Sequence, residues 1–185
     1  MHDFEGFVIH PQEVTLDTSF IVNALIPSEP LHASSSAFMN ALVDAETVLV
    51  YNRLVELELA ETAFKIAVRE QHGNRAWPRM RNDGRVRRRA GRLTKDLLQA
   101  WTDLLSAAPH LCIELHEVSA DVPDIMADTG LASMDAAHAA TATYAGNGAM
   151  VTCDAGFGAV PEANLELYVD AGRVRSVRRR RGGAV

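Results

Sequence analysis

Three aspartates occupy equivalent places in the sequence, each beside the end of an expected strand or the start of an expected helix. Asp17 follows the apolar run 14–16, Asp154 follows the run 149–152, and Asp135 lies in the first turn of a later helix. In an open parallel sheet the carboxyl ends of the strands line one crevice, so these side chains are expected to meet there. Clustered carboxylates repel one another unless a hard cation such as Mg²⁺ or Mn²⁺ neutralises them. The pattern therefore predicts a catalytic metal site.

Each of these aspartates also has an ordinary structural interpretation. Asp17 and Asp154 could be turn residues or helix caps, and Asp135 could complement a helix dipole. The local sequence around all three, in matching order along the chain, favours the catalytic interpretation.

Alternating strands and helices are expected to position these residues. Such alternation implies βαβ crossovers and a parallel sheet with helices on both faces, so the fold class is α/β. The expected strands cover 14–16, 47–50, 111–118, 149–152 and 165–169, and the expected helices cover 18–26, 31–44, 53–70, 93–108, 121–131 and 133–144.

The chain is expected to form a single domain, because 185 residues with 48% hydrophobic and 23% charged side chains suit one globular core. That core is expected over 13–170. Residues 75–92 form a basic insertion, either a loop or the tip of a helical hairpin, because they contain proline and glycine breakers. Residues 1–12 and a basic C-terminal tail, 173–185, are expected to be flexible.

Charge is distributed unevenly along the chain, although the net charge is only -6. Most of the 18 basic residues lie in two segments, 69–95 and 173–181, whose acids are Glu70 and Asp83. An acidic body therefore carries two basic arms, an arrangement that suits a polyanion held near an acidic centre.

Several classes of protein are excluded. The sequence has no apolar run of about 20 residues and its start lacks the basic and apolar regions of a signal peptide, so a cytoplasmic protein is expected. Cys112 and Cys153 are the only cysteines, which excludes a disulfide framework or a four-cysteine zinc site; both are expected to be reduced core residues. Walker, GxSxG and HExxH motifs are absent from the sequence.

Three segments resemble motifs of the PIN domain family. VTLDTSFIVNALI resembles the opening motif, ASMDAAHAATATYAG the third and MVTCDAGF the fourth, in matching order over 14–157. The resemblance implies a three-layer fold with a parallel five-stranded sheet, and a ribonuclease that uses Mg²⁺ or Mn²⁺. It assigns metal-binding roles to Asp17, Asp135 and Asp154. Small members of the family are similar to VapC-type toxins of toxin–antitoxin pairs.

The family's second acidic residue lies at the start of the helix after the second strand, where this sequence offers Glu56, Glu58 and Glu61. Aligning Asn52 with the small polar residue that follows that strand selects Glu58. Helical phase places Glu58 on the polar side, whereas Glu56 would project from the apolar face and would need a partner. We therefore choose Glu58 as the fourth catalytic acid and keep Glu56 as the alternative.

Two further polar groups lie near the motifs. The resemblance implies a hydroxyl near the metal, from Thr18 or Thr152. His138, three residues after Asp135, is either half of a His-Asp zinc pair or a core or surface histidine, and the second interpretation is favoured because further ligands are missing.

The arginine runs have three interpretations. Arg87, Arg88 and Arg89, and the run 178–181, could bind RNA phosphates beside a crevice whose carboxylates repel the substrate. They could instead contact an acidic antitoxin protein, or be solvated surface. Trp77 could stack on an unpaired base.

Two hypotheses follow. The first is a metal-dependent endoribonuclease that hydrolyses RNA phosphodiesters as the toxin-like component of a toxin–antitoxin pair. The second is a catalytically weak PIN-like module that binds RNA or a protein partner. The expected partners are RNA, an acidic antitoxin protein and a second copy of the chain in a homodimer, with no membrane.

Overall fold

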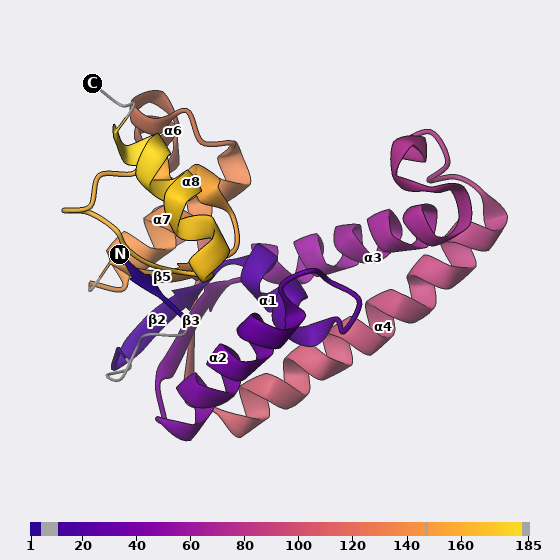
Figure 1. Ribbon diagram of the computed structural model, residues 1–185, viewed down its shortest axis with the longest axis horizontal. Coiled ribbons are helices and arrows are strands. Elements are labelled where there is room, and N and C mark those ends of the chain that lie inside the picture. The colour runs from indigo at the N-terminus through magenta and orange to yellow at the C-terminus, as the bar shows by residue number, and fades with distance from the viewer. Residues whose placement is uncertain (5–10, 147, 183–185) are drawn as a thin grey trace. The chain divides into compact units, whose positions relative to one another are not determined.

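The computed structural model describes residues 1–4, 11–146 and 148–182. It divides into two compact units (Figure 1). The α/β unit comprises Met1–Arg53 and Ala107–Val185, and the helical unit comprises Leu54–Ser106. Each unit is described by itself below.

A parallel sheet forms the centre of the α/β unit, which confirms the predicted fold class. Its strand order is β1-β6-β5-β2-β3-β4, and every neighbouring pair is parallel. The strands are β1 (His2–Asp3), β2 (Glu13–Leu16), β3 (Val48–Asn52), β4 (His110–Ile113), β5 (Ala149–Thr152) and β6 (Glu166–Val169).

The prediction of five strands is wrong by one, because β1 adds a sixth at the edge of the sheet beside β6, where His2 pairs with Tyr168. β1 is two polar residues long and therefore has no apolar alternation that could reveal it in the sequence. The remainder of the predicted flexible segment 1–12 falls partly on 5–10, outside the described residues.

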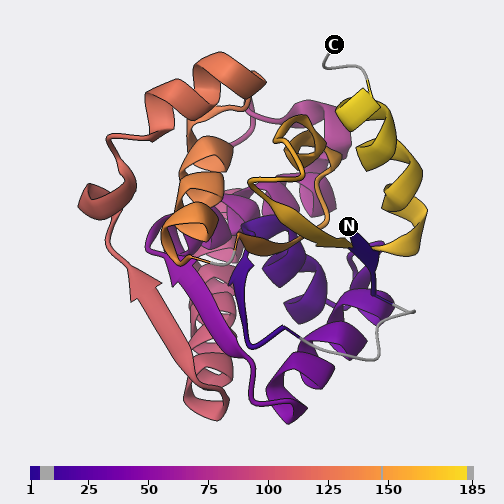
Figure 2. The ribbon, with the colours of Figure 1, turned by 90° about the vertical axis from the view of Figure 1, so that its left-hand side faces the viewer.

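Helices cover both faces of the sheet, as predicted (Figure 2). On β6, Tyr168 stacks on Phe38 of α2, whereas its neighbours Leu167 and Val169 point to the opposite face and join the core beneath α7 and α8. The helices of this unit are α1 (Thr18–Leu25), α2 (His32–Asp44), α5 (Leu115–Val118), α6 (Val122–Thr129), α7 (Ser133–Tyr144) and α8 (Ala171–Gly182), with the 3-10 helix η2 (Ala155–Ala159).

Helix α7 packs close to the sheet because almost all of its buried residues have small side chains. Ala136 and Ala139 pack with Met150 of β5, and Ala140 packs with Val50 of β3. The helix begins at Ser133 and ends at Tyr144, as predicted.

Two segments of this unit differ from their predictions. Residues 111–118 were expected to form one strand, but β4 ends at Ile113 and Glu114 begins α5. Glu114 and Glu117 form a capping box, in which the Glu117 carboxylate accepts from the Glu114 backbone N–H at 2.8 Å. Residues 173–182, expected within a flexible tail, belong to helix α8, while 183–185 lie outside the described residues.

The helical unit is a hairpin of α3 (Leu54–His72) and α4 (Gly84–Ala107), with the 3-10 helix η1 (Asn74–Ala76) near its tip. Ala67 and Val68 of α3 pack with Val86 and Ala90 of α4. Of the expected basic segment 75–92, residues 75–83 connect the two helices, while 84–92 already belong to α4. Helix α4 begins earlier than the predicted residue 93, because Asp83 Oδ1 accepts from the backbone N–H groups of residues 85 and 86 at 2.8 and 3.1 Å.

Across the described ranges, α3 and α4 included, no helix is both long and apolar enough to cross a membrane.

Candidate active site

Asp17 lies between β2 and α1 and is only 4% exposed. Its backbone N–H donates to Val151 of β5 at 3.1 Å, which continues the β2–β5 pairing to the end of the strand. Its Oδ2 atom accepts hydrogen bonds from the hydroxyls of Ser19 and Thr152, the latter at 2.7 Å. Asp17 is the N-cap residue of α1 by position, yet within the described part of the chain its side chain makes no capping hydrogen bond to the helix backbone.

The same two hydroxyls accept from the loop that follows β5. Ser19 Oγ accepts from the Cys153 backbone N–H at 3.0 Å, and Thr152 Oγ1 accepts from the Asp154 backbone N–H at 2.8 Å. Each hydroxyl therefore bridges Asp17 to the segment that carries Asp154. The carboxyl ends of β2 and β5, with two of the predicted aspartates, are thereby connected by these hydrogen bonds.

Asp154 is exposed and is the N-cap residue of η2. Its Oδ1 accepts from the Gly156 backbone N–H at 2.7 Å, so it serves as a cap, as its ordinary structural interpretation predicted. A Cβ atom at position 156 would lie 3.2 Å from that oxygen, so the glycine gives the carboxylate room.

Asp135 is half-buried in the first turn of α7. One turn further along, His138 is fully buried, and its Nε2 atom lies 3.5 Å from the hydroxyl of Thr18, the residue after Asp17. This contact places the beginning of α7 against the beginning of α1, and it directs the Thr18 hydroxyl to His138. The hydroxyls at Asp17 Oδ2 are those of Thr152, one of the two expected from the family resemblance, and Ser19.

His138 is a core histidine with a defined hydrogen-bonding state. The Thr141 hydroxyl donates to Ala137 O at 2.8 Å, so it accepts from Asn52 Nδ2 at 2.8 Å. The same Asn52 nitrogen lies 3.3 Å from His138 Nδ1, which is therefore placed to accept, and His138 Nε2 faces the Thr18 hydroxyl. The favoured interpretation of His138 as a core residue is confirmed.

The oxygen atoms at these strand ends fit a hard divalent cation in kind. Mg²⁺ retains several waters and is commonly held by one or two carboxylates together with phosphates of the substrate. Within residues 1–4, 11–146 and 148–182, no group of three or more His, Cys, Asp and Glu side chains lies close enough to hold a metal ion. Asp17 and Asp154 are the two aspartates that the hydroxyls of Ser19 and Thr152 connect at these strand ends.

Glu58 and its alternative Glu56 both lie half-buried on α3 of the helical unit. Glu61, the third glutamate of this helix turn, forms an ion pair with Arg81 at 2.9 Å. The choice of Glu58 stays a prediction.

The three arginines predicted to bind RNA differ in their surroundings. Arg87 and Arg88 are exposed on α4. Arg89 donates from Nε and Nη2 to the two carboxylate oxygens of Glu70, at 2.8 and 3.1 Å. This bidentate pair lowers the pKa of the Glu70 carboxyl and raises that of Arg89. Arg89 therefore joins α4 to α3, in addition to any part it plays in binding.

Trp77 packs against the small residues between α3 and α4, and the guanidinium of Arg81 lies 5.3 Å from the centre of its ring. One face of the indole is thus engaged within the hairpin.

Sequence reasoning missed Ser19 and Asn52. Ser19 belongs to the Asp-Thr-Ser motif, so a hydroxyl two residues after an aspartate at a helix start was the available signal. Asn52 was used only to align the second motif, and its contact with His138 depends on pairing residues far apart in the chain.

The PIN domain family model matches residues 14–163, which cover β2 through β5 and η2. A search of curated proteins gives no significant match. PIN domains are in general nucleases, which hydrolyse phosphodiester bonds, and PIN nucleases act on RNA. The family match covers most of the chain, and the parallel sheet flanked by helices is consistent with it. The chain belongs to the PIN domain family.

Proposed function

We propose that this protein is a metal-dependent endoribonuclease that uses Asp17, Asp135 and Asp154, with Glu58 as the fourth acid. The observation that carries the proposal is the arrangement at Asp17. A buried carboxylate is held by the hydroxyls of Ser19 and Thr152, directly beside the segment that bears Asp154, in a chain of a nuclease family.

The residues of the chain have distinct parts in this mechanism. Ser19 and Thr152 fix the Asp17 carboxylate, so little reorganisation is needed when it binds its ligand. Asp17 and Asp154 supply anionic oxygens at the ends of adjacent strands, and Asp135 supplies a third from α7. Mg²⁺ or Mn²⁺, when bound to these oxygens, would activate a water molecule and stabilise charge on the leaving oxygen.

The test is cleavage of a structured RNA by the purified protein with Mn²⁺, repeated with excess EDTA and with Asp17→Asn. We expect internal cuts with Mn²⁺, none with EDTA, and strong loss with the variant. Cleavage that survives both EDTA and Asp17→Asn would show a contaminating nuclease and overturn the proposal.

We also propose that the protein is toxin-like, with an acidic antitoxin as its partner. The exposed Arg87 and Arg88 of α4 support this extension, because an acidic segment would complement them. Induced expression should arrest growth of a bacterial host, and Asp17→Asn should abolish the arrest. Normal growth under wild-type expression, with RNA cleavage retained in vitro, would remove the toxin role and leave the nuclease.

A catalytically weak RNA-binding module is the second candidate. The lack of a ready-made cluster of three metal-binding side chains in the described ranges favours it. RNA binding that is independent of metal, without cleavage, would select this candidate.

A further inference from the structure

Helix α8 packs against the rest of the α/β unit along its whole length. Val177 at its middle is fully buried and joins the core that contains Phe157 of η2. The two backbones approach so closely at Gly158 that a Cβ atom there would lie 2.7 Å from Val177 O and 3.0 Å from Arg180 Cβ. The contact therefore requires glycine at 158, and it fixes the helix against η2.

Both ends of α8 are also held. At its start, Asp170 Oδ1 accepts from the Gly172 backbone N–H at 2.8 Å, while Asp170 Oδ2 accepts from Ser34 of α2 at 2.6 Å. At its end, Arg181 donates to Leu165 O at 2.8 Å and forms an ion pair with Glu162 at 3.0 Å. The arginines of α8 therefore project from a helix whose position is fixed at both ends.

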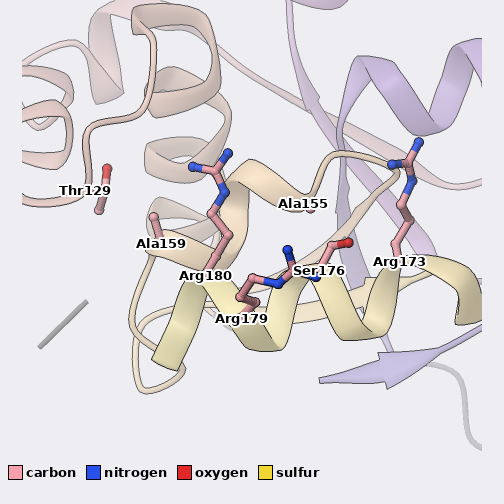
Figure 3. A pocket seen from close by; sticks show the side chains of 7 residues that line it. All are labelled: Thr129, Ala155, Ala159, Arg173, Ser176, Arg179 and Arg180. Carbon is pink, nitrogen blue, oxygen red and sulfur yellow. The ribbon is translucent and has the colours of Figure 1, made fainter. Parts of the chain in front are cut away.

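A pocket of about 680 Å³ lies between α8, η2 and the end of α6. Figure 3 shows the arginine side chains of α8 around it, with Ser176 between them. The lining is strongly basic and includes no carboxylate among the described residues. Its residues are Thr129, Ala155, Ala159, Arg173, Ser176, Arg179 and Arg180.

The charges of this pocket are available for a ligand. Arg173, Arg179 and Arg180 are exposed, and within the described part of the chain none of them has a carboxylate at ion-pair distance. Arg181, by contrast, is occupied by Glu162. Arg173 and Arg180 are seven residues apart, so they share a face of the helix at a separation of about 10 Å along its axis. Two guanidinium groups so spaced suit separate phosphates of one nucleic-acid strand better than a single small anion.

The pocket also adjoins the candidate active site. Ala155, which lines it, follows Asp154 directly, and Ala159 ends the same 3-10 helix.

We propose that the pocket between α8 and η2 binds the phosphodiester backbone of the RNA substrate beside the cut, with Arg173 and Arg180 as the principal phosphate ligands. This inference rests on the proposed function, since it assigns a binding subsite to the same substrate. Arg179 and the Ser176 hydroxyl supplement the two arginines.

The test compares two double variants of equal charge. In Arg173→Gln with Arg180→Gln, both pocket ligands are removed. In the control, Arg175→Gln with Arg178→Gln, two exposed arginines of the same helix that do not line the pocket are removed. Circular dichroism and thermal unfolding should be the same for both. Binding of a fluorescein-labelled single-stranded RNA is measured by anisotropy over a salt series in EDTA, and the RNA is checked for integrity on a denaturing gel.

We expect the pocket variant to bind RNA at least about tenfold more weakly at low salt, and to flatten the dependence of log affinity on log salt by about 1.4, or 0.7 for each lost phosphate contact. The control variant should change both quantities much less. Equal effects of the two variants would overturn the inference, because they would show only a loss of net charge.

A decaglutamate peptide is the probe for the competing occupant. If the wild-type protein bound this peptide more tightly than RNA at equal ionic strength, and only the pocket variant lost that binding, an acidic protein would be the ligand and the inference would be wrong. The proposed function is tested by a separate measurement. Cleavage with Mn²⁺ decides whether the protein is a nuclease, whereas anisotropy in EDTA decides where RNA binds.

Discussion

The Thr152 hydroxyl donates a hydrogen bond of 2.7 Å to Asp17 Oδ2 while it accepts one of 2.8 Å from the Asp154 backbone N–H. One buried side chain thus orients a candidate ligand on one strand and the loop that carries another. Thr152 acts through Asp17, so it is a positioning residue.

Replacement of Thr152 by valine tests this role, because valine keeps the shape and removes the hydroxyl. We expect cleavage to fall about tenfold or more and stability to fall by about 1–3 kcal/mol, since two buried polar partners lose their hydrogen bond. Urea unfolding and the Mn²⁺ concentration for half-maximal cleavage are measured together. Thr152→Ser keeps the hydroxyl, so it should return the Mn²⁺ concentration for half-maximal cleavage to the wild-type value. If it does not, Thr152 has a packing role alone.

Removal of each candidate ligand should affect catalysis and leave the fold intact. Asp17→Asn, Asp135→Asn and Asp154→Asn should each lower the cleavage rate by at least about a hundredfold, the scale on which positioned catalytic groups act. Asp128→Asn, at an exposed aspartate of α6, is the matched control and should cleave normally. Initial rates at saturating Mn²⁺ are compared. A fully active Asp154→Asn protein would mean that this residue is only the cap of η2.

The second acidic motif is resolved by a pair of substitutions on α3. If Glu58 is the fourth catalytic acid, Glu58→Gln should lose cleavage with thermal stability little changed. Glu56→Gln should keep cleavage and shift stability instead. The opposite pattern in the same two assays would move the motif by two residues and would leave the family assignment untouched.

Substitutions of the α4 arginines should differ in their effect on RNA binding, because the arginines have different contacts. Replacement of the exposed Arg87 and Arg88 by glutamine should reduce the slope of log RNA affinity against log salt by up to about 1.4. Arg89→Gln should reduce that slope less, because Glu70 already binds its guanidinium. Anisotropy titrations at several salt concentrations measure both. An unchanged slope for the Arg87 and Arg88 variant would make these side chains solvated surface or an antitoxin contact.

Cysteine reactivity provides a pH-dependent check on the packing near Asp17. Burial raises the pKa of the Cys153 thiol to about 11, and the thiolate is the reactive form. At pH 8 we therefore expect iodoacetamide to modify Cys153 far more slowly than the less buried Cys112, with the Cys153 rate rising as the pH approaches 11. Peptide mass spectrometry measures the two rates. Equal modification at pH 8 would contradict the buried position of Cys153.

The sequence sufficed for those features that depend on neighbouring residues. Apolar runs located β2, β3 and β5, small residues located α7, and the motif around Asp17 located the end of the first core strand. Features that depend on contacts between residues far apart in the chain could not be predicted from the sequence. The edge strand β1 exists only because β6 offers a partner, and α8 is fixed because Val177 finds a place beside Gly158.

The candidate site likewise combines features that the sequence predicts with features that depend on distant contacts. That Asp17 and Asp154 follow strands of one parallel sheet was expected from strand-and-helix alternation, whereas the pairing of these two strands was not. The bonds of Asp17 with Ser19 and Thr152 could not be read from the sequence, because they depend on β5 packing beside β2. The early start of α4 was missed for a local reason, since Gly84 and Gly91 suggested a pliable segment and outweighed the cap at Asp83.

The strand order has a consequence for folding during synthesis. Strand β2 lies between β3, which follows it closely in the chain, and β5, which is made more than a hundred residues later. Strand β1 pairs with β6, the strand nearest the C-terminus among the described residues. The sheet therefore stays incomplete on the ribosome until nearly the whole chain has emerged. The contacts between α3 and α4 are local, so we expect the hairpin to form first and the half-built sheet to be the aggregation-prone intermediate.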